Sequence, residues 1–335
     1  MRRNSNNAKV KPYKWIKKEI EASNPYTEYE KIWRLSIEYG AGEFMQNLIY
    51  ASTFSNFVAN PWGAQVVWRE DGGKVLHRAT DRMHQMQYNN SIWWYYGPSH
   101  PETCKSVEAI NKLHEHYAQR YPGNFSHMED YLYVLCFTAT SVDRFRKRLR
   151  LPGFSEKQKI AAFIFWREMS KLFYAENRVP LEGFPDDWEG MVRFCEKIEN
   201  EHLMVTDEGH MIAEALFDQF AFRFFPRPLR PLGRAIPISV ALPQTLRAHR
   251  IRPIKPILAH IIIFILGTFI WFAETFLPDP TVSYQELLRS RTAAEKAQHD
   301  KETRDLDARF PEYFASFHRS SAAMCPFSVA SKKQT

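Results

Sequence analysis

The chain has 335 residues, a formal net charge of +7 and 13 glycines, and its composition is 44% apolar and 15% aromatic. This length allows a well-buried core, and the lack of a G-x-G-x-x-G or Walker-type glycine run argues against a nucleotide-binding fold. The basic residues form no single stripe, which argues against nucleic acid as a partner.

Residues 1–35 are polar and basic, and they predict an arm or a short surface helix. Residues 39–68 are rich in apolar and aromatic side chains, and the asparagines and Pro61 among them predict a buried helix and a turn. Residues 74–95 predict one continuous helix, and residues 102–121 predict the next.

The middle of the chain carries two capping boxes, Ser126-His-Met-Glu and Ser155-Glu-Lys-Gln. Each is expected to open a helix, because a serine side chain at this position accepts a hydrogen bond from a free backbone N–H group. A further helix is expected over residues 207–225, and the proline-rich residues 226–256 predict a linker.

Residues 257–277 read ILAHIIIFILGTFIWFAETFL and carry one full charge, at Glu274. A helix of this length can cross the hydrocarbon core of a bilayer, which is about 30 Å thick. Basic residues from Arg247 to Lys255 precede it and Asp279 follows, so the charge bias favours a tail that crosses to the far side. A buried core helix and a monotopic anchor are the alternatives.

The sequence therefore predicts an all-α protein: one large helical domain with a C-terminal membrane helix and a tail. The expected boundaries are 1–35 for the basic arm, 36–250 for the helical domain, 251–280 for the membrane-anchoring helix and 281–335 for a polar, partly disordered tail. The first part of this tail, residues 284–309, is expected to be a surface helix.

The four cysteines are widely spaced and form no C-x-x-C pair, so the sequence indicates neither a zinc knuckle nor a disulfide framework. They are Cys104, Cys136, Cys195 and Cys325. No cleavable signal peptide is expected at the N-terminus, which lacks an apolar stretch.

The helix over residues 102–121 contains the most informative histidine. Val107, Ile110, His114, Tyr117 and Tyr121 follow one another at steps of three and four residues, so His114 is expected to face inward. A neutral imidazole among aromatic rings can be an axial ligand of haem iron. It can equally be a core histidine held by a hydrogen bond.

The helix before it carries a polar stripe, flanked by Arg78 and Arg82. The stripe consists of His77, Thr80, Asp81, His84 and Tyr88. Such a stripe is either a solvated face or one wall of a haem pocket, in which Arg78 and Thr80 would bind propionates or polarise oxygen.

Two other clusters have competing explanations. A di-iron carboxylate centre needs two Glu-x-x-His motifs, but Glu199-x-x-His202 is expected to be a solvated surface and Asp81-x-x-His84 is a weak match. His210, Glu214 and Asp218 are spaced by four residues and are expected to form solvent-exposed salt links.

Five motifs in chain order resemble the ER-bound MpaB oxygenases and the rubber oxygenases. They are Arg78-x-Thr80, Asn111-x-x-His114, the run from Asp130 to Tyr133, Trp166-Arg167, and Leu242-Pro-x-x-Leu-Arg247. The resemblance spans residues 39–250. It implies an all-helical domain that holds haem b and uses dioxygen to cleave carbon–carbon double bonds of isoprenoid chains.

By this resemblance, His114 would bind the haem iron, with Asn111, Arg78 and Thr80 as further haem-binding residues. Two positions depart from the pattern. Ala79 stands where the rubber oxygenases have a lysine, and Cys136 stands where many bacterial members have a second histidine. These departures leave the distal group open, and His77 or His84 could replace it.

The resulting prediction is a membrane-bound haem oxygenase of the endoplasmic reticulum, attached by a single-pass or monotopic helix. Its partners would be dioxygen, a hydrophobic isoprenoid or lipid-like substrate and the lipid membrane, with Arg78, Thr80 and His84 contributing to catalysis. The alternative is a non-catalytic, membrane-anchored helical protein that binds lipid or acts as a scaffold.

Overall fold

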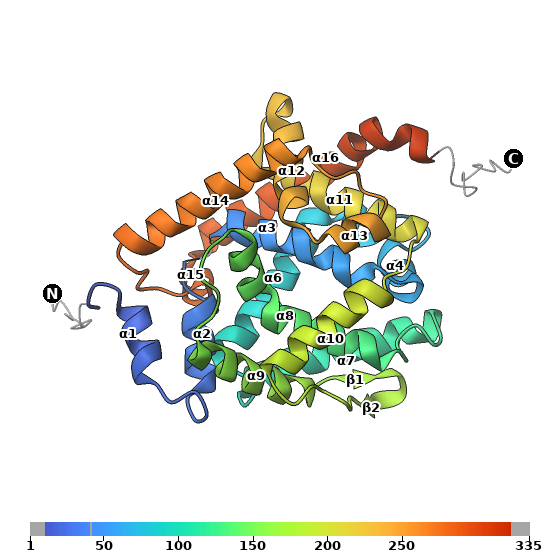
Figure 1. The fold of residues 1–335 in the computed structure, drawn as a ribbon. Coiled ribbons are helices and arrows are strands. Elements are labelled where there is room, and N and C mark those ends of the chain that lie inside the picture. Colours follow the sequence, from blue (N-terminus) through green and yellow to red (C-terminus); the bar gives the residue numbers. More distant parts are fainter. Residues whose placement is uncertain (1–10, 41, 323–335) are drawn as a thin grey trace, which may run out of the picture. The chain divides into compact units, whose positions relative to one another are not determined.

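The computed structural model describes residues 11–40 and 42–322, and their regular secondary structure is almost entirely helical (Figure 1). Strand is limited to a short antiparallel pair, β1 (Tyr174–Ala175) and β2 (Val179–Pro180), within the described residues. The all-α prediction is therefore confirmed.

The chain divides into two compact units. Unit 1 comprises residues 1–46, 87–203 and 254–291, and unit 2 comprises residues 47–86, 204–253 and 292–335. Two helices, α3 (Glu43–Thr53) and α6 (Ala79–Tyr96), contain residues of both units.

Unit 1 is built around four helices that pack on one another: α2, α8, α9 and α10. Its core is aromatic, since the ring of Trp33 contacts those of Phe154, Phe165 and Trp166 at centroid distances of 5.4 to 6.3 Å. The helices of this unit are α1 (Trp15–Ala22), α2 (Tyr29–Ile37), α7 (Pro101–Arg120), α8 (Met128–Arg148), α9 (Glu156–Ser170), η2 (Glu176–Arg178), α10 (Trp188–Glu201), α14 (Pro256–Phe276) and α15 (Tyr284–Ser290).

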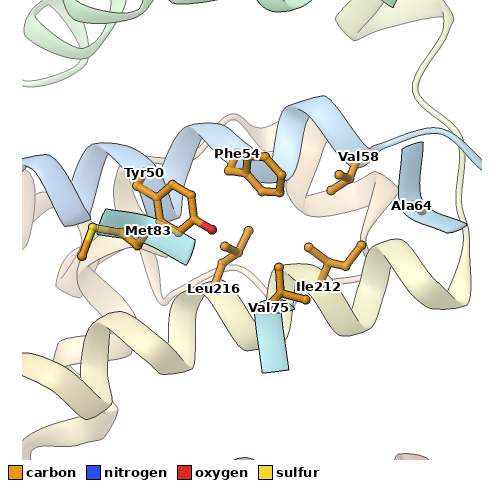
Figure 2. Close-up of a cluster of buried hydrophobic side chains, with 8 residues drawn as sticks. All are labelled: Tyr50, Phe54, Val58, Ala64, Val75, Met83, Ile212 and Leu216. Atoms are coloured by element: carbon orange, nitrogen blue, oxygen red, sulfur yellow. The ribbon is translucent and has the colours of Figure 1, made fainter. Parts of the chain in front are cut away.

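Unit 2 is organised around one buried helix, α11, which packs against α4, α5, α12 and α16. Part of its core consists of Tyr50, Phe54, Val75, Ile212 and Leu216, which face one another in Figure 2. The helices of this unit are η1 (Phe54–Val58), α4 (Pro61–Trp68), α5 (Gly73–His77), α11 (Asp207–Phe224), η3 (Arg227–Leu229), α12 (Arg230–Val240), α13 (Pro243–Ala248) and α16 (Ala293–Ala322).

The described part of the predicted arm, residues 11–35, is packed against unit 1. Trp15 and Ile20 of α1 and Ile32 of α2 are buried together against Ala161 in unit 1. The apolar residues of each helix are spaced so that they form one buried face. The overall charge of the segment does not show this pattern.

Capping explains where two of the predicted helices begin. Ser155 opens α9 with a complete capping box, and Thr206 opens α11 with a hydrogen bond to the backbone N–H of Gly209. The other expected box is wrong, because α8 begins at Met128 and the hydroxyl of Ser126 donates to the carbonyl of Gly123 instead.

The segment predicted as one helix over residues 74–95 is two helices, because Arg78 leaves the helical conformation (φ −143°, ψ 47°) between α5 and α6. The proline-rich segment is also largely helical rather than a linker. Pro243 occupies the first turn of α13. Proline is tolerated there because an N–H group in the first turn makes no hydrogen bond within the helix.

The polar tail contains α15 and the long helix α16, which extends beyond the expected end at residue 309. Phe310 and Phe314 of α16 are buried against Phe222 in unit 2, so the C-terminal half of this helix is part of a core rather than a surface element. The end of the chain predicted to be disordered, residues 323–335, lies outside the described residues.

Candidate functional site

The residues predicted to form a site fall into both units. Asn111 and His114 belong to unit 1, whereas Arg78, Thr80 and His84 belong to unit 2. Each group is described within its own unit.

Helix α7 places His114 where its periodicity predicts. Val107 and Asn111 of the same face are buried, and the side-chain amide of Asn111 donates to the carbonyl oxygen of Leu172 at 2.9 Å. This bond fixes the middle of α7 and holds His114 one turn further along, against the chain that follows the helix.

The imidazole of His114 lies between two aromatic rings, with centroid distances of 4.9 Å to Phe125 and 5.8 Å to Tyr131. Its Nδ1 atom is buried and makes no hydrogen bond to the described residues. Burial lowers the pKa of His114 to about 4, because the charged form would lose its hydration. The ring is therefore neutral at physiological pH and offers a nitrogen lone pair.

The space beside His114 is small. A cavity of about 10 Å³ is bounded by residues of α7, the loop after it, α8 and β1, which include Asn111, His114, Phe125, Tyr131 and Tyr174. That volume holds about one water molecule, whereas sites for cofactor-sized ligands measure about 300 Å³ or more. The donor atom fits an iron ligand, but the residues in this conformation do not fit a porphyrin.

Three further aromatic side chains of unit 1 are packed against other rings. Phe173 contacts Trp93 at 5.7 Å, and Phe137 contacts Tyr133 at the same distance. Trp166 is buried against Trp33 and Phe165. These contacts make the three side chains part of the core of unit 1.

Arg78 and Thr80 have different surroundings in unit 2. The guanidinium of Arg78 is 57% exposed and pairs with Asp81 at 2.7 Å. Thr80 is buried; its backbone N–H donates to Asp307 at 2.7 Å and its hydroxyl accepts from Gln219 at 3.5 Å. Because the helix is interrupted at Arg78, between α5 and α6, the Arg78 side chain is exposed, whereas Thr80 in the first turn of α6 is buried.

His84 lies against helix α16. Its ring centroid is 4.4 Å from that of His299, and its Nδ1 is 3.3 Å from the hydroxyl of Thr303. His299 and Thr303 were absent from the sequence-based site because α16 was expected to be a polar surface tail. The apolar spacing of Leu306, Phe310 and Phe314 was the signal that this helix packs inward.

A buried cluster of charges in unit 2 corrects the prediction for His210, Glu214 and Asp218. Glu214 and Asp218 are buried rather than solvated, and both pair with Arg234, at 2.6 Å in the case of Asp218. His318 lies 2.8 Å from Asp218, whereas His210 bonds the carbonyl of His249. Glu214, Asp218 and His318 could together hold a cation, but Arg234 already pairs with one oxygen of each carboxylate.

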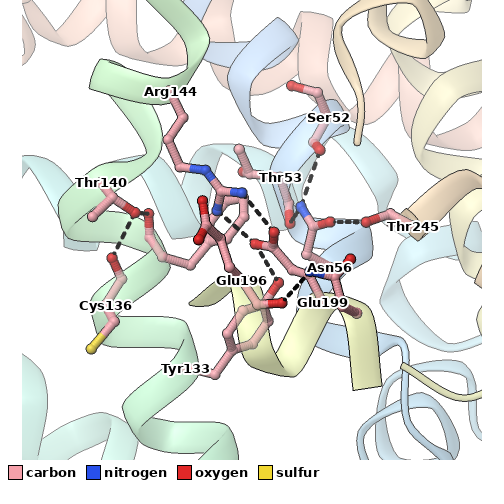
Figure 3. A network of polar contacts seen from close by, with 12 residues as sticks. Ser52, Thr53, Asn56, Tyr133, Cys136, Thr140, Arg144, Glu196, Glu199 and Thr245 are labelled. Atoms are coloured by element: carbon pink, nitrogen blue, oxygen red, sulfur yellow. Dashed lines mark hydrogen bonds and ion pairs between the residues drawn. The ribbon is translucent and has the colours of Figure 1, made fainter. Parts of the chain in front are cut away.

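The motif Glu199-x-x-His202 is likewise not a solvated surface, because Glu199 is only 3% exposed. Both of its carboxylate oxygens accept from the guanidinium of Arg144 at 2.6 Å, and the hydroxyl of Tyr133 lies 3.3 Å away (Figure 3). His202 is half-exposed. A carboxylate bound in this way is not available to a di-iron centre.

Comparison with known families gives one match. Residues 38–299 match the family described as ER-bound oxygenase mpaB/B′/rubber oxygenase, catalytic domain. The matched region extends past residue 250 and includes α14 and α15. No curated protein matches the chain.

Proposed function

Because the chain belongs to the mpaB/rubber oxygenase catalytic-domain family, we propose that it is a membrane-attached, haem-dependent oxygenase acting on a hydrophobic chain. The substrate would be an isoprenoid or another lipid-like molecule with a carbon–carbon double bond. Cleavage would place one atom of dioxygen on each of the two carbons. The family match over most of the chain is the observation that carries this proposal.

The chemistry of His114 supports the proposal. Its imidazole is neutral at physiological pH, and its buried Nδ1 has no hydrogen-bond partner among the described residues. A neutral histidine nitrogen is the form that binds iron. When bound, haem b would supply the redox-active iron that reaction with dioxygen requires.

The cavity beside His114 sets a condition on this role. Since about 10 Å³ cannot hold a macrocycle, haem binding at this residue requires Phe125 and Tyr131 to move away from the imidazole. Helix α7 itself can remain in place, because Asn111, one turn before His114, stays bonded to the carbonyl oxygen of Leu172. Arg78, Thr80 and His84 remain proposed as further residues of the site.

The same cavity favours a second candidate function. If the rings around His114 stay closed, the chain keeps the family fold without the cofactor. It would then be a non-catalytic, membrane-anchored protein that binds lipid or acts as a scaffold. The exposed apolar side chains of α14 suit this function as well as the first.

Absorption spectroscopy of the purified full-length protein separates the two functions. We expect a Soret band, either as isolated or after addition of hemin, and its loss in His114→Ala with unchanged helicity by circular dichroism. His116→Ala is the matched control, because His116 lies on the same helix and is exposed.

Each result has a distinct meaning. A Soret band that persists in His114→Ala would show that a residue other than His114 binds the iron, and His84 would be tested next. A protein that stays colourless after hemin addition would favour the non-catalytic function and overturn the haem proposal.

A further inference from the structure

Helix α14 exposes one long apolar face. Large apolar side chains along its length point outward, and the largest exposed fractions are 78% at Ile257, 71% at Phe264 and 68% at Phe269. Phe272 and Phe276 continue the same face, each more than half exposed. A contiguous row of large exposed apolar residues is rare on a soluble surface and marks a site of interaction.

The opposite face of α14 is packed against unit 1. Ile262 and Ile263 are buried, and a Cβ atom at Gly267 would lie 2.5 Å from the carbonyl oxygen of Leu149, so the helix backbone approaches closely there. Glu274, the one full charge of the helix, pairs with Arg146 of α8. The middle of α14 is therefore in contact with protein and not surrounded by lipid.

The C-terminal end of α14 is bound by the start of the chain. The hydroxyl of Tyr13 donates to the carbonyl of Thr275 at 2.8 Å, and the ammonium of Lys14 donates to that of Leu277. These carbonyls have no partner within a helix. The bonds fix this end of α14 to unit 1.

The chain that follows α14 also stays with unit 1. Asp279 accepts from the backbone N–H of Ile16 at 2.9 Å. Further along, the backbone N–H groups of Tyr284 and Gln285 donate to Glu38, at 2.9 and 3.0 Å. A helix that crosses a bilayer delivers its two ends to opposite surfaces, about 30 Å apart, whereas these contacts keep the chain that follows α14 on the surface of unit 1.

We propose that α14 lies in the plane of a membrane surface, with the Ile257–Phe276 face inserted among the lipids and the following tail on the same side as the rest of the chain. The proposal deepens the membrane attachment inferred above and rests on it. Interfacial helices of this kind bury one apolar face by about 5–10 Å at the headgroup boundary.

The charge at the start of α14 favours an anionic lipid surface as the occupant. Lys255 borders an open groove of about 480 Å³, which is otherwise lined by Pro256, Ile257, Leu258 and Ile261. An ammonium group beside apolar side chains matches an anionic headgroup above its acyl chains. The outward face carries no acidic side chain, since Glu274 is bound to Arg146.

Flotation with vesicles tests the lipid-facing side. Full-length protein should bind vesicles of phosphatidylcholine with phosphatidylserine, and the double variant Phe264→Asp, Phe269→Asp should lower the affinity about a hundredfold. Leu113→Asp is the matched control, because Leu113 is a 49% exposed apolar residue of α7 in the same unit. Its binding should be unchanged, and thermal unfolding should show that all three proteins are folded.

The assignment of this face would be overturned if the double variant binds vesicles as tightly as the wild type. It would also be overturned if Leu113→Asp loses as much affinity as the double variant. A wild-type protein that fails to bind vesicles would overturn the membrane attachment together with it. Neither result bears on the haem proposal, which has its own spectroscopic test.

Translation of the full chain in the presence of microsomes tests the side of the tail. An epitope appended to the C-terminus should be removed by protease while the microsomes are intact. In addition, Ser290→Asn, which creates a glycosylation acceptor with Arg291 and Thr292, should remain unmodified. An epitope that is protected until detergent is added, or a glycosylated variant, would show that α14 crosses the membrane and would overturn the in-plane arrangement while retaining the attachment.

Discussion

The guanidinium of Arg144 and the carboxylate of Glu199 form a bidentate pair in the interior of unit 1, with two N–H···O distances of 2.6 Å. Glu199 is almost fully buried, and the hydroxyl of Tyr133 lies 3.3 Å from the same carboxylate. A planar guanidinium matches a carboxylate in this geometry. The pair therefore links α8 to α10 and leaves no free oxygen on Glu199.

Removing one member of this pair should be strongly destabilising. We expect Arg144→Met to lower the free energy of unfolding by about 3–5 kcal/mol, because it leaves a buried carboxylate uncompensated. The double variant Arg144→Met, Glu199→Met should recover most of that loss. Urea unfolding of the three proteins measures both effects, and a double variant as unstable as the single one would contradict the explanation.

Gly267 should tolerate no larger side chain, because a Cβ atom there would lie 2.5 Å from the carbonyl oxygen of Leu149. We expect Gly267→Val to destabilise the packing of α14 on unit 1 by about 1–3 kcal/mol. Thr268→Val, at the adjacent exposed position, is the control and should change little. The two variants are compared by limited proteolysis and thermal unfolding, and equal behaviour would argue against this contact.

Glu38 should make stability depend on pH. Burial raises its pKa from 4.5 to about 7. Between these values the folded state holds a proton that the unfolded state has released, so stability falls as pH rises through this window. The shift corresponds to a loss on the order of 3 kcal/mol.

Glu38→Gln tests this relationship, because glutamine can still accept the hydrogen bond from Gln285. The variant should be less sensitive to pH between about 4.5 and 7, and more stable than wild type above pH 7. Denaturant unfolding at several pH values measures the difference. Parallel curves for the two proteins would show that Glu38 does not titrate in this range.

Asp307 of α16 caps the start of α6 from a distant part of the chain. Its carboxylate accepts from the backbone N–H groups of Thr80 at 2.7 Å and Asp81 at 3.2 Å. We expect Asp307→Ala to cost about 1 kcal/mol, the usual effect of losing an N-cap. Asp305→Ala removes an exposed carboxylate of the same helix and serves as the control. An equal effect of both variants on thermal unfolding would exclude a capping role.

The parts of the fold that depend on neighbours in sequence were predicted from the sequence. Ser155 and Gln158 lie three positions apart and form the expected capping box, and α7 and α11 have the expected extents. His114 lies partly buried among aromatic rings, as the spacing along α7 predicts. The capping box at Ser126 failed because its hydroxyl bonds Gly123, on the preceding turn.

The candidate site was less predictable, because its surroundings come from remote segments. Thr80 and His84 both contact α16, more than 200 positions further along the chain. A helical spacing shows that a side chain faces inward, but it does not show what packs against that side chain. The size of the cavity beside His114 depends on Phe125 and Tyr131, which lie outside α7.

The sequence alone determined the all-helical class, the family and the apolar segment of α14, because each is a pattern of residue types along a continuous stretch. Only the tertiary structure decided which charges are buried and which face of α14 is free. Arg144 lies 55 positions from Glu199, and His318 lies 100 positions from Asp218. The free energy of such pairs depends on burial and on distance in space, and neither quantity is encoded in the local spacing of residues.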